Sequence, residues 1–476
     1  MSQTQQISAS HEREEPRLER QLGLSASFSM ITGSMLGIGI FLAPCLAARH
    51  ISTSGLFFGA WIFTGMIALT GAWIYAQLGV MLPRSGGDYV FHREAMGNSV
   101  AFSYGWGLLS AAFAGSLAAM SVALCAYQLL PLFGVSNVEL ITLSLFGESL
   151  SITTAQLGAL ILIGLITLIN TYGLAISAKL QQVIAYLPLA ALFLICAFLF
   201  TCEPVITSAA KLPAAQSVEQ WSYSGISNAF LEIYFAYSGW NAIIYVAGEI
   251  KEPKRTIPLA LIGGTITVMC LYLFFCAAAL HYVGLEGLRG FYLTHTDLGS
   301  GIANQLGGGW ISTGMTTLVT VALLASINAT VIGGGRLAYM MANDGCFWRA
   351  ASEIDQRFGT PNKALWILAF ISALITIFIP YDLIFRLISL VMVLGGLLTA
   401  TSYYILKLKH SIHGLSPTDW ILPPLFMFSS LSVIAIKVSE AIEGEPQALL
   451  PLVGLALILC VFCVHLVYRL AKSRAE

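Results

Sequence analysis

Long apolar runs dominate this sequence and restrict its fold more than any other feature. A helix needs about 20 apolar residues to cross the roughly 30 Å core of a bilayer. Twelve runs approach or exceed this length, and their approximate positions are 25–48, 54–82, 99–131, 155–174, 180–202, 224–248, 257–283, 310–336, 364–380, 383–406, 419–437 and 447–468. The sequence therefore predicts an all-α integral membrane protein with 12 transmembrane helices.

Composition and motifs exclude several other classes of protein. Only 10% of the 476 residues are charged and the net charge is −1, so there is no basic face for nucleic acid and little polar surface for a soluble enzyme. A membrane-embedded enzyme would need converging catalytic groups, and a channel or sensor would need rings of charge or a filter repeat. Neither pattern is visible. These two classes remain the alternatives, and we expect no catalytic residue, metal or cofactor.

The distribution of positive charge predicts how the chain is oriented. With the N-terminus inside, 18 of the 23 Lys and Arg residues fall in cytoplasmic segments and 5 in outer ones. This asymmetry follows the positive-inside rule. Residues 1–24 are charged and read as a cytosolic tail, since they do not resemble a signal peptide. We therefore predict a multi-pass protein of the cell (inner) membrane with both termini cytoplasmic.

Two of the runs contain residues that do not favour a regular helix. The first has three glycines within seven residues, in Gly33–Gly39. The sixth has small and polar residues at its middle, in Phe235–Asn241. Each pattern alone also fits close helix packing through small residues. Because they fall in the first and sixth runs, they occupy corresponding positions of two five-helix halves, which is typical of an inverted-repeat transporter with broken helices.

Four segments resemble motifs of the amino acid–polyamine–organocation (APC) permeases. They are Gly33–Pro44 (GSMLGIGIFLAP), Pro83–Gly97 (PRSGGDYVFHREAMG), Phe235–Pro258 (FAYSGWNAIIYVAGEIKEPKRTIP) and Gly333–Gly345 (GGGRLAYMMANDG). The third resembles most closely the L-amino-acid transporter-like branch. The resemblance implies a five-plus-five inverted repeat, with repeats at 25–202 and 203–406 and two additional helices at 407–476. It also implies secondary active transport of an α-amino acid by alternating access, as ion-coupled symport or as exchange.

The resemblance also assigns roles to main-chain groups of the two broken helices. The amides of Ile38 and Gly39 would hold the substrate carboxylate, and Gly37 would permit its close approach. Carbonyls would hold the substrate ammonium, namely those of Met35, Phe235 and Ser238. Main-chain recognition suits this task, because all α-amino acids share these two charged groups.

Side-chain roles are less well determined by the motifs. Phe235 would close over the substrate as a gate. Trp240 and Asn241 would line the side-chain pocket, or else Trp240 packs and Asn241 caps the second half-helix. Glu232 would belong to an outer vestibule, relay a proton, favour cationic substrates or lie at the interface as a structural carboxylate.

A departure from the family pattern concerns the coupling ion. Many relatives carry a lysine inside the fifth span, where its ammonium takes the place of a sodium ion, and Pro188 stands at that position here. Sodium coupling becomes more plausible, with Ser326 and first-span carbonyls as ligands, while proton coupling and exchange remain open. The expected partners are an amino acid, the lipid bilayer and a sodium or proton co-substrate. The sequence does not indicate a partner subunit.

Overall fold

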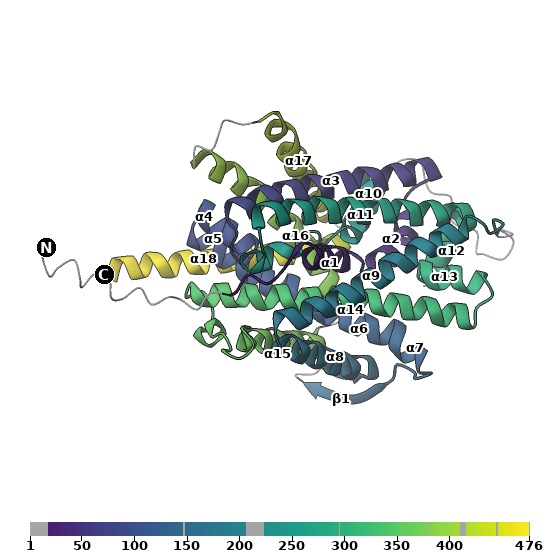
Figure 1. Cartoon of the computed structure of the whole chain (residues 1–476), viewed down its shortest axis with the longest axis horizontal. Coiled ribbons are helices and arrows are strands. Elements are labelled where there is room, and N and C mark those ends of the chain that lie inside the picture. Colours follow the sequence, from purple (N-terminus) through teal and green to yellow (C-terminus); the bar gives the residue numbers. More distant parts are fainter. Residues whose placement is uncertain are drawn as a thin grey trace, which may run out of the picture.

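The computed structural model describes residues 18–475 apart from 146–147, 206–222, 295, 380, 410–415 and 444–445. Most of the predicted cytosolic tail therefore lies outside the described residues. Nearly all secondary structure is helical, and the long helices run roughly along one direction (Figure 1). The all-α prediction needs one correction. An antiparallel hairpin, β1 (Glu139–Leu145) and β2 (Glu148–Thr153), joins the third and fourth predicted spans.

The helices have the following bounds. In the first half they are α1 (Leu24–Met35), α2 (Gly39–Ala48), α3 (Ser54–Met81), α4 (Asp88–Met96), α5 (Asn98–Gly107), η2 (Leu108–Gly115), α6 (Ser116–Leu124), η3 (Cys125–Leu129), α7 (Leu130–Leu132), α8 (Thr154–Thr171) and α9 (Leu174–Leu199). In the second half they are α10 (Tyr223–Ala236), η4 (Ala242–Glu249), α11 (Pro253–Tyr282), α12 (Gly284–Leu293), α13 (Leu298–Gln305), α14 (Trp310–Asn343), η5 (Arg349–Ser352), α15 (Asn362–Phe378) and α16 (Tyr381–Lys409). The last two are α17 (Pro417–Ile442) and α18 (Pro446–Ala475).

Among the described residues, nine segments are long and apolar enough to cross a membrane. They overlap predicted spans one to five, seven, eight, ten and eleven. Two shorter apolar helices, Asn362–Phe378 and Leu452–Leu466, overlap the ninth and twelfth. The sixth predicted span is divided between α10 and η4. The chain is thus a polytopic membrane protein.

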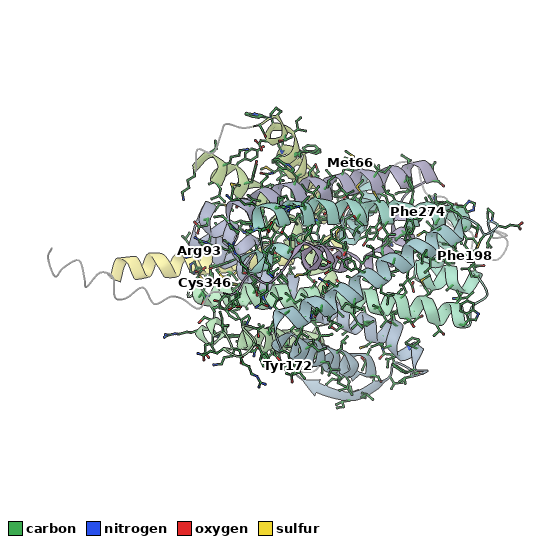
Figure 2. The ribbon with its side chains drawn as sticks, in the orientation of Figure 1. Met66, Arg93, Tyr172, Phe198, Phe274 and Cys346 are labelled. Carbon is green, nitrogen blue, oxygen red and sulfur yellow. The ribbon has the colours of Figure 1, made fainter. Side chains whose placement is uncertain are left out.

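Apolar side chains occupy both the inside and the outside of the bundle. Met30, Phe41 and Trp61 are fully buried in the core, whereas Met66 and Phe198 are more than half exposed on the outer surface (Figure 2). In water such exposure would be unfavourable, but on a membrane protein it faces lipid tails. The outer surface therefore agrees with the membrane assignment.

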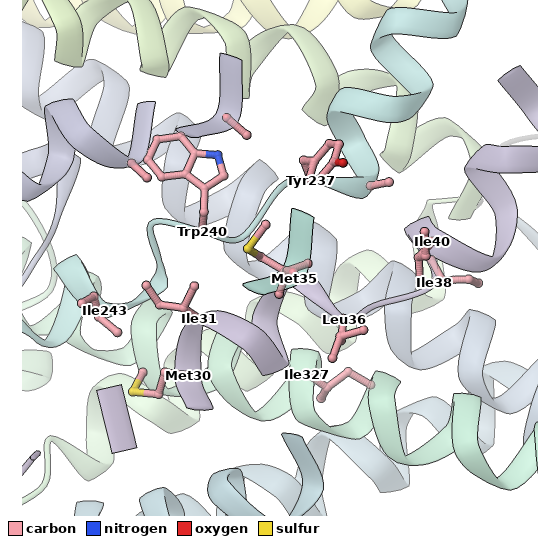
Figure 3. Close-up of a cluster of buried hydrophobic side chains, with 14 of the residues drawn as sticks. Met30, Ile31, Met35, Leu36, Ile38, Ile40, Tyr237, Trp240, Ile243 and Ile327 are labelled. Atoms are coloured by element: carbon pink, nitrogen blue, oxygen red, sulfur yellow. The ribbon is translucent and has the colours of Figure 1, made fainter. Parts of the chain in front are cut away.

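Two short interruptions of the helices lie among the central residues of the molecule. The first apolar segment stops being helical at Leu36 and resumes at Gly39, so α1 and α2 are separated by three residues. Residues 237–241 form a turn between α10 and the tight helix η4. Figure 3 shows Met35, Leu36 and Ile38 along the first interruption, with Tyr237 and Trp240 of the second beside them.

Candidate functional site

The two interruptions lie against each other, and glycines make this approach possible. A Cβ on Gly39 would lie 2.6 Å from the Cα of Ala236, and one on Gly239 would lie 2.6 Å from the Oγ of Ser34. Gly239 also has φ of +96°, a conformation that residues with a side chain rarely adopt. Glycine is therefore required at the points where the two interrupted segments cross.

Backbone groups around the first interruption differ in whether they are already hydrogen-bonded. The amides of Ile38 and Gly39 have no acceptor within the described part of the chain, as expected at the start of a helix. These amides lie at the positive end of the dipole of α2, which attracts a carboxylate. The carbonyl of Met35 instead accepts from the amide of Gly37 at 2.8 Å and from the hydroxyl of Tyr272 at 2.5 Å. Of the carbonyls predicted to bind the substrate ammonium, that of Met35 is thus already occupied by two hydrogen-bond donors.

A central cavity of about 130 Å³ lies next to the interruptions. Its wall contains four of the residues predicted from sequence, Phe235, Ser238, Asn241 and Ser326. Other parts of the wall come from α1, α3, α4, α5, η2, α6, η4, α14 and α16, including Ser34, Tyr75, Asp88, Leu108, Phe113, Met120, Tyr245 and Met392. Segment η2 is a π-helix, a local irregularity common at functional sites. Met35, Gly37, Ile38, Gly39 and Trp240 do not line this cavity.

Trp240 and Asn241 turn out to have different surroundings. Trp240 is 5% exposed and packs edge-on against Tyr75, with ring centroids 4.7 Å apart, and against Phe426. It also borders a second cavity of about 30 Å³, which Asn241 shares. Asn241 precedes η4 but its side chain makes no capping hydrogen bond. Trp240 therefore combines packing with a cavity wall, while Asn241 faces both cavities.

Ser326 lies where α14 contacts the last turn of α1. Its hydroxyl donates to the carbonyl of Ser34 at 3.2 Å, and a Cβ on Gly37 would lie 3.5 Å from it. Pro188 is buried within α9. Among the described residues, no group of three His, Cys, Asp or Glu side chains is placed to hold a metal ion.

Asp88 is a carboxyl-bearing residue of the cavity wall that the sequence did not single out. Its carboxylate is 1% exposed and accepts hydrogen bonds from the hydroxyls of Tyr75 on α3, Tyr245 on η4 and Thr399 on α16, the last at 2.6 Å. Thr399 also lies 2.9 Å from Nε2 of His92, and burial lowers the pKa of His92 to about 4. The Asp88 position falls within the PRSGGDY motif, but nothing local indicates that it reaches the cavity.

An ion pair lies at each end of the bundle, one of them buried and the other more exposed. Arg336 and Glu249 form a two-pronged pair at 2.9 and 3.2 Å, and both side chains are almost completely buried. At the C-terminal end of α2, Arg49 pairs with Glu232 at 3.1 Å in a more exposed setting. His50 lies 3.7 Å from the same Glu232 oxygen. Glu232 thus belongs to a polar cluster outside the central cavity.

A bundle of apolar helices with a small central cavity, beside which two interrupted helices cross, defines a polytopic membrane protein with an internal cavity. Residues 22–468 match the model of the amino acid permease family. The chain therefore belongs to that family.

Similar proteins are transporters by name. Asc-type amino acid transporter 1 of Mus musculus is 26% identical over 353 residues, which cover 74% of this chain and 63% of the relative. Large neutral amino acids transporter small subunit 2 of Homo sapiens is 25% identical over 350 residues, covering 73% and 62%. The b(0,+)-type amino acid transporter 1 of Homo sapiens is 25% identical over 359 residues, covering 75% and 69%. None of these three is named as an enzyme, in agreement with the prediction.

Proposed function

We propose that this protein is a secondary transporter that moves α-amino acids across the cell membrane by alternating access. The observation that carries the proposal is the crossing of two interrupted helices beside the central cavity. Family membership and the transporter names of the relatives support the same assignment. The substrate is an α-amino acid, because the main-chain groups at the crossing suit its two common charged groups.

The proposed scaffold has 12 spans arranged as a five-plus-five inverted repeat with two additional helices. The nine long apolar segments, the two shorter apolar helices and the divided α10–η4 segment together supply this number. The interruptions then fall in the first and sixth spans, at equivalent positions of the two halves. Both termini lie on the cytoplasmic side in this arrangement, following the distribution of Lys and Arg.

In the proposed binding mode, the amides of Ile38 and Gly39 hold the substrate carboxylate. Both amides lack another acceptor among the described residues. The carbonyls of Phe235 and Ser238 hold the ammonium, with Met35 as a third ligand only if Tyr272 gives up its hydrogen bond. Phe235 is half-buried at the cavity wall, which suits a gate.

The cavity wall near Asn241 receives the side chain of the substrate. The lining residues Leu108, Phe113, Met120 and Met392 are apolar. They favour an uncharged side chain, and one relative is named for large neutral amino acids. Trp240 supports this wall from behind by packing on Tyr75.

Energy for transport comes from an ion gradient or from exchange for a second amino acid. A sodium ion would use Ser326 and first-span carbonyls, and it would have to displace the hydrogen bond from Ser326 to the carbonyl of Ser34. Exchange requires no ion site. A proton is the third candidate for the coupling ion.

Counterflow in proteoliposomes tests the proposed function. Vesicles are preloaded with one unlabelled amino acid, chosen in turn across the charge and size classes, or left empty, and a labelled amino acid is added outside. We expect saturable uptake that depends on the preloaded amino acid. Replacing Gly39 by Leu should abolish it, because even a Cβ there lies 2.6 Å from Ala236.

Gly164→Leu is the matched control for the Gly39 variant. Gly164 lies within α8 and a Cβ there would meet nothing within 4 Å. This variant should transport like the unmodified protein. Absence of saturable uptake of any amino acid by folded protein would refute the assignment.

A further inference from the structure

The Asp88 side chain is a buried carboxyl group with no cationic partner among the described residues. It is 1% exposed, lines the central cavity and forms no ion pair with any described Lys, Arg or His side chain. Burying an isolated carboxylate is costly, and an ionisable group within a membrane protein is a functional candidate for that reason. Three hydroxyl donors reduce this cost, but none of them is a cation.

The surroundings of Asp88 favour a proton over a larger cation. Hydroxyls from three separate elements enclose both carboxylate oxygens, and almost none of the side chain is accessible. A sodium ion would need several oxygen ligands and room for itself, whereas a proton needs only a lone pair on one oxygen. The titratable groups that face Asp88 from its own and neighbouring elements are tyrosine hydroxyls or a buried imidazole: Tyr75, His92, Tyr104, Tyr234 and Tyr245.

A chain of hydrogen bonds leads away from Asp88. Thr399 donates to the carboxylate and lies 2.9 Å from Nε2 of His92, which is itself fully buried. The Nδ1 of His92 has no partner among the described residues and forms the end of the chain. Burial holds the pKa of His92 near 4, so its imidazole is neutral and one nitrogen is free to accept.

We propose that Asp88, Thr399 and His92 form a proton site and relay that couples proton uptake to amino acid transport. This inference rests on the proposed function. A proton binds Nδ1 of His92 once a change of conformation makes this buried nitrogen accessible, the Nε2 proton passes to the oxygen of Thr399, and the hydroxyl proton of Thr399 passes to Asp88. The result is a neutral carboxylic acid and a neutral imidazole of the other tautomer, with one proton gained.

The same hydrogen bonds explain how protonation would affect conformation. Hydrogen bonds to an ionised acceptor are about twice as strong as those between neutral groups. Asp88 ties α3 and η4 to α16 through Tyr75, Tyr245 and Thr399. Neutralising the carboxylate weakens all three ties at once. The second half of the interrupted sixth span is then freer to move.

Transport by reconstituted protein under an imposed pH gradient tests the relay. Proteoliposomes carry a pH-sensitive dye inside, and amino acid accumulation and internal acidification are followed together, with and without sodium. For unmodified protein we expect accumulation driven by an acidic exterior and amino-acid-dependent acidification of the interior. Thr399→Val keeps the side-chain shape and removes the hydroxyl, so it should reduce both signals at least tenfold.

Counterflow separates loss of coupling from loss of folding. It requires no net proton movement, so Thr399→Val should still show it. Thr399→Ser is the matched control, since it restores the hydroxyl and should restore pH-driven accumulation. If Thr399→Val does not fold, Asp88→Asn replaces it and should abolish amino-acid-dependent acidification.

Three results would overturn the relay. They are accumulation by unmodified protein that ignores pH, accumulation that depends on sodium alone, and full pH-driven accumulation by Thr399→Val. In each case counterflow by the unmodified protein leaves the proposed function intact. Absence of counterflow with every amino acid overturns both.

Discussion

Gly239→Ala is the sharpest test of the crossing between the two interruptions. The substitution adds one methyl group at a residue with φ of +96°, which costs an L-residue about 1–2 kcal/mol. The new Cβ would also lie 2.6 Å from the Oγ of Ser34 and 2.7 Å from its carbonyl oxygen. Relieving such overpacking typically costs about 1–3 kcal/mol more. The two terms together predict a loss of about 2–5 kcal/mol.

The strain falls at the substrate site, so transport should suffer more than folding. We expect counterflow to fall at least tenfold and the thermal midpoint in detergent to fall by several degrees. Gly164→Ala is the matched control, because it adds the same methyl group within a helix where nothing lies within 4 Å. It should leave transport unchanged and raise stability by about 0.4–1 kcal/mol. Normal transport and stability in Gly239→Ala would show that the interruptions do not cross as described.

Three further substitutions probe other parts of the molecule. Arg336→Leu leaves Glu249 buried and unpaired, so we expect a loss of about 3–5 kcal/mol, measured as a lower thermal midpoint; Glu249→Gln in the same chain should recover part of it. Ser326→Ala removes one neutral hydrogen bond and should lower the stability of the fold by about 1 kcal/mol. Loss of sodium-stimulated uptake in this variant would assign the hydroxyl to a sodium site. His92 has its pKa lowered to about 4, so the unfolded state binds more protons below pH 6.5 and stability must fall as pH decreases toward 4. His92→Gln should flatten that fall in thermal midpoints recorded between pH 6.5 and 4, and an unchanged slope would contradict the assignment.

Local sequence patterns alone led to the prediction of two interrupted helices. Glycine weakens a helix wherever it occurs, so Gly37 and Gly39 marked the first interruption without any tertiary information. The structure confines the unwound part to three residues, since Gly33 stays within α1. The predicted spans likewise follow from hydropathy alone, because a bilayer imposes the same length on each of them.

Long-range contacts decide what the sequence could not show. Asp88 lies in a recognisable motif, but its three hydroxyl partners come from positions 75, 245 and 399. Only the packing of α3, η4 and α16 brings them together. The hydrogen bond from the hydroxyl of Tyr272 to the carbonyl of Met35 likewise joins residues that are far apart in the sequence. The hairpin β1–β2 was missed because its residues lie between two strongly apolar runs that dominated the pattern.

The placement of the buried charges bears on how the proposed cycle is driven. The amide of Leu22, just before α1, donates to the carbonyl of Glu249, so the Glu249–Arg336 pair lies at the end where the first span begins. Arg49 and Glu232 lie where that span ends, and Arg49 is 37% exposed there. Exposed pairs contribute little, whereas separating a buried pair is costly. Opening the Glu249 end therefore needs more free energy than opening the Arg49 end. If the protein works as proposed, we expect substrate binding together with neutralisation of Asp88 to supply that difference.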